Sequence, residues 1–182
     1  MRLANALDRV IVYDPKGDDP EVQMPNAAVA WGVDAALKAI PGRVIYHPTA
    51  AEFGNLAAAW ERIIKKILVT GGHHGIVVHE TCDLGSARVG FMPLMSMALR
   101  QGRSRAITRI FCSQRPVSDV PRLAISEAKH FVAFYLQDER DRQALAAYMG
   151  PEVEGRTEFN HDYWYCGRGS GMRAVRCAAL PA

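Results

Sequence analysis

Ile76-Val-Val-His-Glu80 and Ile110-Phe-Cys-Ser-Gln-Arg-Pro116 are the two stretches that decide the fold. Each begins as a short apolar run of strand type and ends in polar residues, which predicts two buried strands with a charged or amide side chain at the tip. In open α/β sheets, ligands bind at the carboxyl ends of the strands. A glutamate there can accept a proton from water, and an amide on a neighbouring tip can contact a terminal phosphate. We therefore expect Glu80 and Gln114 to form a nucleotide-hydrolysing edge.

Strand and helix patterns alternate along the rest of the chain. This alternation predicts an α/β fold with a mainly parallel sheet flanked by helices, and the last strand-like runs predict a C-terminal antiparallel hairpin with its turn at residues 167–171. Residues 15–30, rich in Pro, Asp and Gly, are expected to form a surface loop. The expected strands are 9–13, 43–47, 75–79, 105–112, 129–136, 159–166 and 173–177, and the expected helices are 50–68, 91–99, 120–128 and 138–149, with the end of another helix at 2–7.

Composition narrows the class of protein. With 182 residues and 49% hydrophobic content, the chain is expected to form a single domain, residues 1–182. Its net charge of +3 is too small to identify a nucleic-acid partner, and no apolar run approaches the ~18 to 20 residues that span a bilayer. The four cysteines lack C-x-x-C spacing, so we interpret them as free thiols in a reducing, cytoplasmic compartment.

Several motifs, taken in order, resemble the HerA/FtsK family of P-loop ATPases. The resemblance covers residues 2–165, and the Gln-Gly-Arg and Ser-Gln-Arg-Pro pieces are its most specific parts. It implies a P-loop NTPase-like fold of the RecA/ASCE type. It also implies a ring-shaped motor, expected to be a homo-hexamer, that uses ATP and Mg²⁺ to translocate or package DNA. The expected location is the cytoplasm, which is the host cytoplasm if the protein is viral. The motifs are Val10-Ile-Val-Tyr-Asp14-Pro-Lys16, Ile76-Val-Val-His-Glu80, Leu99-Arg-Gln-Gly-Arg103, Cys112-Ser-Gln-Arg-Pro116 and Ala128 to Leu136 with Asp141.

The resemblance also implies roles for individual residues. Glu80 matches the catalytic glutamate, Gln114 matches the polar sensor on the next strand, and Arg103 is a candidate for the arginine that reaches a neighbouring subunit's nucleotide. Asp14 and Lys16 are candidates for the nucleotide-binding edge, although a Pro-Gly turn with solvated charges explains them equally well.

The sequence departs from the family at two places. His79 stands at the position of the Mg²⁺-binding aspartate, and a neutral imidazole is a poor ligand for this hard cation. The phosphate-binding motif G-x-x-x-x-G-K-[ST] does not occur in the chain. We therefore expect the first strand, the phosphate loop and the start of the first helix to be missing, through a mis-set start, a truncated reading frame or an evolved loss.

The family's strand order indicates where the missing strand belongs. It lies between the strand that ends near Gln114 and the strand that ends near Leu136. Its absence is expected to leave two central edges with unpaired backbone groups, or to force these two strands together.

Two other functions remain open. A non-catalytic family member that serves in ring assembly or nucleic-acid binding shares every motif present here. A metal-dependent hydrolase built around His79 and Glu80 is the second alternative, but its metalloprotease-like spacing needs a helix where the sequence predicts a strand. Its further ligands are His73, His74, Cys82 and Asp83.

Two sets of residues can be explained by a structural role as well as by a functional one. The basic run Arg100, Arg103, Arg105 and Arg109 either contacts phosphate or forms a solvated helix end. We interpret Trp31, Trp60 and Trp164 as core or rim residues rather than base-stacking platforms.

Overall fold

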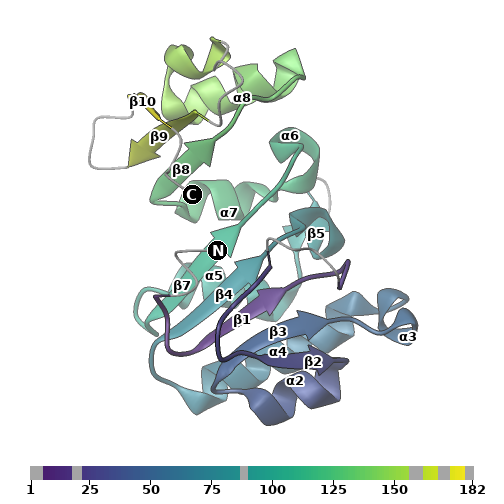
Figure 1. The fold of residues 1–182 in the computed structure, drawn as a ribbon. Coiled ribbons are helices and arrows are strands. Elements are labelled where there is room, and N and C mark those ends of the chain that lie inside the picture. Colours follow the sequence, from purple (N-terminus) through teal and green to yellow (C-terminus); the bar gives the residue numbers. More distant parts are fainter. Residues whose placement is uncertain (1–5, 18–21, 87–89, 156–161, 168–172, 179–182) are drawn as a thin grey trace.

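The computed structural model describes residues 6–17, 22–86, 90–155, 162–167 and 173–178. At its centre lies a five-stranded parallel sheet with the order β2-β3-β1-β4-β7 (Figure 1). The predicted mainly parallel sheet is therefore confirmed. Its strands are β1 (Val10–Tyr13), β2 (Ala28–Trp31), β3 (Arg43–His47), β4 (His74–Val78) and β7 (Ile107–Phe111).

Three helices cover one face of this sheet. The chain passes from β2 to β3, from β3 to β4 and from β4 to β7 in the same direction across the sheet, so right-handed crossovers place the intervening helices on the same side. The helix α4 contacts both of the others (Figure 1). These helices are α2 (Val33–Ala39), α4 (Leu56–Thr70) and α5 (Pro93–Gln101), and the one-turn helix α3 (Ala50–Phe53) precedes α4.

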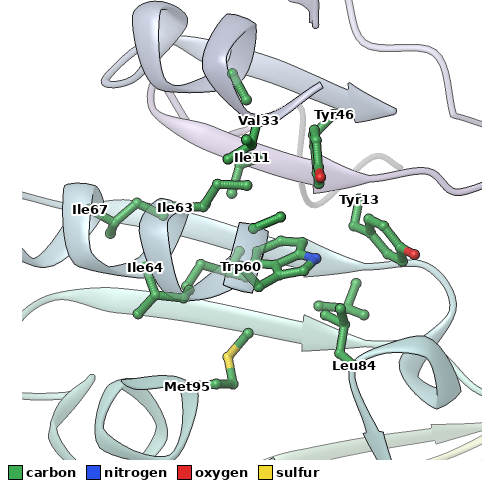
Figure 2. Close-up of a cluster of buried hydrophobic side chains, with 14 of the residues drawn as sticks. Ile11, Tyr13, Val33, Tyr46, Trp60, Ile63, Ile64, Ile67, Leu84 and Met95 are labelled. Atoms are coloured by element: carbon green, nitrogen blue, oxygen red, sulfur yellow. The ribbon is translucent and has the colours of Figure 1, made fainter. Parts of the chain in front are cut away.

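Trp60 lies at the centre of the core between the helices and the sheet (Figure 2). Its side chain is fully buried, and its ring meets Tyr13 and Tyr46 edge-on at centroid distances of 5.6 and 6.0 Å. Ile63 and Ile64, one turn further along α4, extend the same apolar stripe. This packing fixes the carboxyl ends of β1 and β3, where both tyrosines lie.

The opposite face of the sheet packs against the segment between β1 and β2. Strand residues alternate between the faces, so the residues that turn away from the helices form a second apolar cluster. This cluster consists of Val10, Val12, Ile45 and Val77 from the sheet with Val22 and Met24 from the connecting segment.

A smaller antiparallel sheet, with the order β10-β9-β8, lies beyond the β7 side of the large sheet (Figure 1). Its inner residues pack against α8 in a third cluster. In the described part of the chain, β7 is hydrogen-bonded only to β4, and β8 only to β9. This part comprises α6 (Pro116–Asp119), α7 (Arg122–Glu127), β8 (His130–Ala133), α8 (Glu139–Met149), η2 (Pro151–Glu154), β9 (Tyr163–Gly167) and β10 (Val175–Cys177).

Two sequence predictions about this region are resolved. The C-terminal antiparallel strands are confirmed as β9 and β10. Of the two outcomes expected for β7 and β8, the structure shows separated edges rather than a forced pair. The predicted helix at 2–7 and the turn at 167–171 lie largely outside the described residues, as do residues 159–161 of the predicted strand.

Other predictions need correction. Residues 15–30 are not loop throughout, because Ala28–Trp31 forms the edge strand β2, and α2 was missed. Both segments are short, and three of the four β2 residues are exposed, so neither has a strong apolar pattern. The predicted helix 50–68 is split at Gly54, because the Asn55 side chain accepts a hydrogen bond from the Ala58 N–H and begins a new helix there.

Candidate functional site

The carboxyl ends of β1 and β4 lie side by side where the chain connections diverge. The two strands pair in parallel register up to Tyr13 opposite Val78. The connection after β1 leads to β2, on the β3 side of the sheet, whereas the connection after β4 leads to β7, on the other side. Such a topological switch point leaves a crevice at the sheet edge, which is where open α/β sheets bind ligands. The sequence-predicted residue Glu80 lies two positions beyond this pair.

Glu80 is held in place by the residues on both sides of it. The His79 N–H donates to the Tyr13 carbonyl oxygen at 3.3 Å, which attaches the loop to β1. The buried Thr81 attaches it to β7, because its N–H and its hydroxyl both donate to the Cys112 carbonyl oxygen, at 3.1 and 2.6 Å. The sequence analysis missed Thr81, for which no motif gave a signal. A carboxylate fixed between two strand ends is suited to orienting a water molecule.

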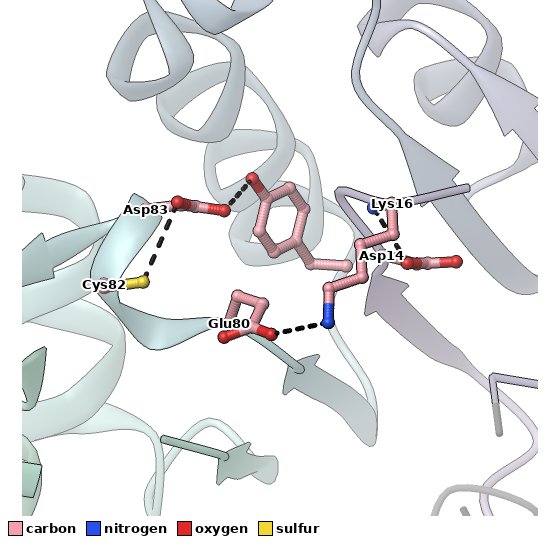
Figure 3. A network of polar contacts seen from close by, with 6 residues as sticks. Asp14, Lys16, Glu80, Cys82 and Asp83 are labelled. Carbon is pink, nitrogen blue, oxygen red and sulfur yellow. Dashed lines mark hydrogen bonds and ion pairs between the residues drawn. The ribbon is translucent and has the colours of Figure 1, made fainter. Parts of the chain in front are cut away.

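Lys16 and Asp14 belong to the same edge but face different neighbours (Figure 3). The Lys16 ammonium lies 3.2 Å from a Glu80 carboxylate oxygen, and the Glu80 side chain is only 20% exposed. The Asp14 carboxylate turns away from Glu80 and lies 3.4 Å from His47 Nδ1. Of the two predicted nucleotide-edge residues, the structure therefore brings Lys16 to Glu80 and places Asp14 in a separate buried pair.

A tyrosine and an acid form a second contact across the switch point. The Tyr13 hydroxyl donates to Asp83 Oδ2 at 2.9 Å (Figure 3). Burial, followed by the nearby Asp83 carboxylate, raises the pKa of Tyr13, so this hydroxyl remains a hydrogen-bond donor at physiological pH. Partial burial, followed by Asp83, also raises the pKa of the Cys82 thiol. A thiol that stays protonated is a poor metal ligand and a poor nucleophile.

Gln114 lies beyond the end of β7, the strand next to β4. The register pairs Val78 with Phe111, so Glu80 and Gln114 emerge on neighbouring strands of the same edge. The turn that carries Gln114 is braced by Ser113, whose hydroxyl accepts from the Arg115 N–H at 3.1 Å and donates to Asp119 at 3.3 Å. The amide side chain is exposed and stands on a defined turn.

Asp141 connects this turn to the small sheet's helix. It lies in the first turn of α8, is 5% exposed, and accepts a hydrogen bond from the Val117 N–H at 3.0 Å. Val117 is in the first turn of α6, directly after the Gln114 turn. Asp141 thus satisfies a free N–H group at a helix N-terminus from outside the helix.

Replacing Asp141 by alanine is expected to lower the free energy of unfolding by about 1–3 kcal/mol, because the Val117 N–H loses its acceptor. Asp141→Asn is the matched control, since its amide oxygen can accept the same hydrogen bond, and it should retain most of the stability. Urea denaturation of the three proteins measures the difference. Equal losses in both variants would show that the hydrogen bond is not what Asp141 contributes.

Arg103 lies at the other end of the sheet from Glu80. It follows α5 and precedes the amino end of β7, which pairs with His74 at the start of β4. The five residues of β4 span roughly 17 Å, so Arg103 is far from the Glu80 edge of the same chain.

Arg109 has a structural role among the basic residues. Its guanidinium donates to the carbonyl oxygens of Ala98 and Leu99, at 2.9 and 3.1 Å, and so stabilises the end of α5. The structural interpretation of the basic run therefore fits Arg109, which is partly buried against the end of α5, whereas Arg103 is exposed.

The proposed metal ligands do not come together. His73 and His74 precede β4 or begin it, whereas His79, Cys82 and Asp83 follow its far end. Among the residues that the structure describes, no three His, Cys, Asp or Glu side chains are placed to hold a metal ion. The geometry of the described residues does not support the metal-dependent hydrolase.

Comparison with known proteins identifies a relative. The chain is 35% identical over 149 residues to the DNA packaging ATPase P9 of Enterobacteria phage PRD1, an alignment that covers 79% of this chain and 59% of P9. The chain is a relative of a viral packaging ATPase. It spans less than two thirds of that relative's length. No protein-family model matches the chain.

Solved structures agree on the fold. The genome packaging NTPase B204 of Sulfolobus turreted icosahedral virus 2, in complex with AMPPCP, superposes with a TM-score of 0.75 at 12% identity, covering 100% of this chain and 88% of that one. The DNA-packaging ATPase B204 of Sulfolobus turreted icosahedral virus gives a TM-score of 0.63 at 14% identity, covering 95% and 83%. The P-loop NTPase-like fold is thus confirmed, and the sequence match to P9 supports the resemblance to packaging ATPases. Within the described residues, no helix is long and apolar enough to cross a membrane.

Proposed function

We propose that this chain is the core of a motor ATPase that couples ATP hydrolysis to the packaging of viral DNA. The observation that carries the proposal is the placement of Glu80 at the switch point, held between β1 and β7, in a relative of a DNA packaging ATPase. In this proposal Glu80 accepts the proton of the attacking water, and the Gln114 amide contacts the terminal phosphate.

The edges of β7 and β8 support a location for the phosphate-binding segment. Both strands have an edge without a hydrogen-bonded neighbour in the described part of the chain, and they belong to separate sheets. A parallel strand inserted beside β7 would join the two sheets and end at the same edge as Glu80 and Gln114. We infer that a segment outside residues 1–182 supplies this strand together with the phosphate loop and the first part of a helix. That loop would bind the ATP phosphates, and Mg²⁺ would be bound with them.

Assembly and location follow from the same proposal. Arg103 is exposed and distant from its own Glu80, which supports a ring, expected to be a hexamer, in which Arg103 serves the neighbouring subunit. DNA is the proposed cargo, and the host cytoplasm is the proposed location.

Nucleotide titration tests the proposal. We expect residues 1–182 alone to bind Mg-ATP weakly or not at all, because backbone N–H groups and a lysine of the phosphate loop supply most contacts to the β- and γ-phosphates. Adding a strand–loop–helix segment that carries a Gly-Lys-Ser motif at the amino terminus should bring binding into the micromolar range. Isothermal titration calorimetry of both proteins measures this.

Each outcome of the titration decides something. Low-micromolar binding by residues 1–182 alone would place the nucleotide elsewhere in the fold. The same extended protein with the loop lysine changed to alanine is the control, and it should not bind. The alternative function is a non-catalytic member of the family that serves in ring assembly or nucleic-acid binding, and the missing phosphate-loop motif favours it. An extended protein that folds but neither binds nor hydrolyses ATP would support this alternative.

A further inference from the structure

A hollow opens at the carboxyl ends of β1, β3 and β2, on the side of Asp14 away from Glu80. Its volume is about 480 Å³, and it is open to solvent rather than enclosed. Apolar side chains form most of its wall, and the Asp14–His47 pair forms its polar end. Among the lining residues are Met24, Val29, Ile45 and Trp31.

The Trp31 side chain contacts His47 and Gly17, yet most of its surface is exposed to solvent. Its ring lies 4.5 Å from the His47 ring, centroid to centroid, with an angle of 37° between the planes. Gly17 also lies against the indole, so that a Cβ atom there would lie 2.7 Å from Trp31 Cη2, and its φ of +76° favours glycine. Even so, 61% of Trp31 is exposed. A fixed aromatic surface beside a hollow is a preorganised stacking platform.

The polar groups at the end of the hollow already have partners within the protein. His47 Nδ1 lies 2.9 Å from the Asp14 carbonyl oxygen, and Asp14 Oδ1 accepts from the Lys16 N–H at 3.1 Å. The Asp14 and His47 side chains are only 3% and 6% exposed. A cationic ligand such as a guanidinium would lose hydration on the mainly apolar wall without gaining an exposed anion. A neutral planar ring can pack on this wall and keep its hydrogen-bonding edge in water at the open mouth of the hollow, so it loses less hydration.

We propose that this hollow binds a nucleobase, which stacks on Trp31 and keeps its polar edge at the open mouth of the hollow. The site is distinct from the Glu80 edge and does not depend on ATP hydrolysis there. Two sources supply this ligand chemistry, a free mononucleotide and an unpaired base of a DNA strand. Base stacking on an aromatic side chain contributes about 1–3 kcal/mol, which corresponds to a roughly 5- to 150-fold change in affinity.

Binding of three probes to residues 1–182 tests the site. The probes are deoxyadenosine monophosphate, a ten-nucleotide deoxyadenylate strand and deoxyribose 5-phosphate, which lacks a base. Quenching of indole fluorescence and equilibrium dialysis report binding. Trp31→Ala should weaken binding of the base-containing probes at least fivefold, and Trp31→Tyr should restore most of it. Phe134→Ala is the control, because Phe134 is 56% exposed but lies just beyond β8 in the small-sheet region.

The outcomes separate the two sources. Binding of the mononucleotide but not of the abasic sugar phosphate identifies a nucleotide site. Binding of the strand alone identifies contact with single-stranded DNA, and ultraviolet cross-linking should then label the peptide that contains Trp31. Equal binding by the native protein and Trp31→Ala, equal binding of the abasic probe, or no binding of any probe would overturn the proposal.

Discussion

Replacing Glu80 by glutamine is expected to reduce ATP turnover by about 100-fold or more in a protein that carries the phosphate-binding segment. The amide has the shape of the carboxylate but cannot accept the proton of the attacking water. Nucleotide affinity should be retained, because the proposed phosphate contacts lie on another segment. Steady-state phosphate release and calorimetric titration measure the two quantities. A 100-fold loss corresponds to about 2.7 kcal/mol of lost transition-state stabilisation.

Asp83→Asn is the matched control for this variant. Asp83 belongs to the same loop as Glu80, but it accepts the hydrogen bond from Tyr13, which an amide oxygen can also accept. Its turnover should therefore remain within about tenfold of the parent protein. If Glu80→Gln keeps turnover within about threefold while Asp83→Asn is inactive, the catalytic carboxylate is Asp83, and the assignment of Glu80 is wrong.

The second large effect is expected for Arg103→Ala, which should reduce turnover by about 1,000-fold or more, as for an arginine that stabilises charge on the transferring phosphate. Because Arg103 lies at the opposite end of the sheet from Glu80, we propose that it acts on a neighbouring subunit. Mixing the inactive Arg103→Ala and Glu80→Gln proteins should therefore restore part of the activity. Some interfaces of the mixed ring then pair an intact Glu80 with an intact Arg103.

Arg105→Ala provides the control for Arg103. Arg105 is exposed on the same turn, and its side chain donates to Gln101 in the preceding helix. It should remain active within a few-fold. If rings that demonstrably exchange subunits show no recovery, Arg103 acts in its own subunit or contacts DNA phosphates. Arg105 and Arg115 would then be the next candidates for the arginine that reaches a neighbouring nucleotide.

The sequence predicts those residues of the candidate site that directly follow a strand. Glu80 and Gln114 could be assigned to one edge because an apolar run that ends in a polar residue indicates a strand end, and parallel strand ends share an edge. Asp14 does follow a strand at that edge, but the direction of its side chain depends on His47, which lies 33 residues away and carries no local signal.

The parts that sequence reasoning missed are tertiary contacts. The Thr81 bonds to Cys112 and the Asp141 bond to Val117 join segments about 31 and 24 residues apart, so no short motif encodes them. Likewise, β2 has a weak pattern because it is an edge strand with exposed residues, and its formation depends on β3.

The parallel pairing of the large sheet also determines when this protein can begin to fold. Val10 of β1 pairs with Arg43 and with Gly75, so β1 is synthesised before either of its partner strands. At about 5–20 residues per second, this apolar strand waits for seconds without a neighbour. Closing such long loops also slows folding compared with a helical bundle or a hairpin. The nascent chain therefore passes through a stage in which the apolar strand β1 has no partner strand, and unpaired apolar strands of this kind are prone to aggregate.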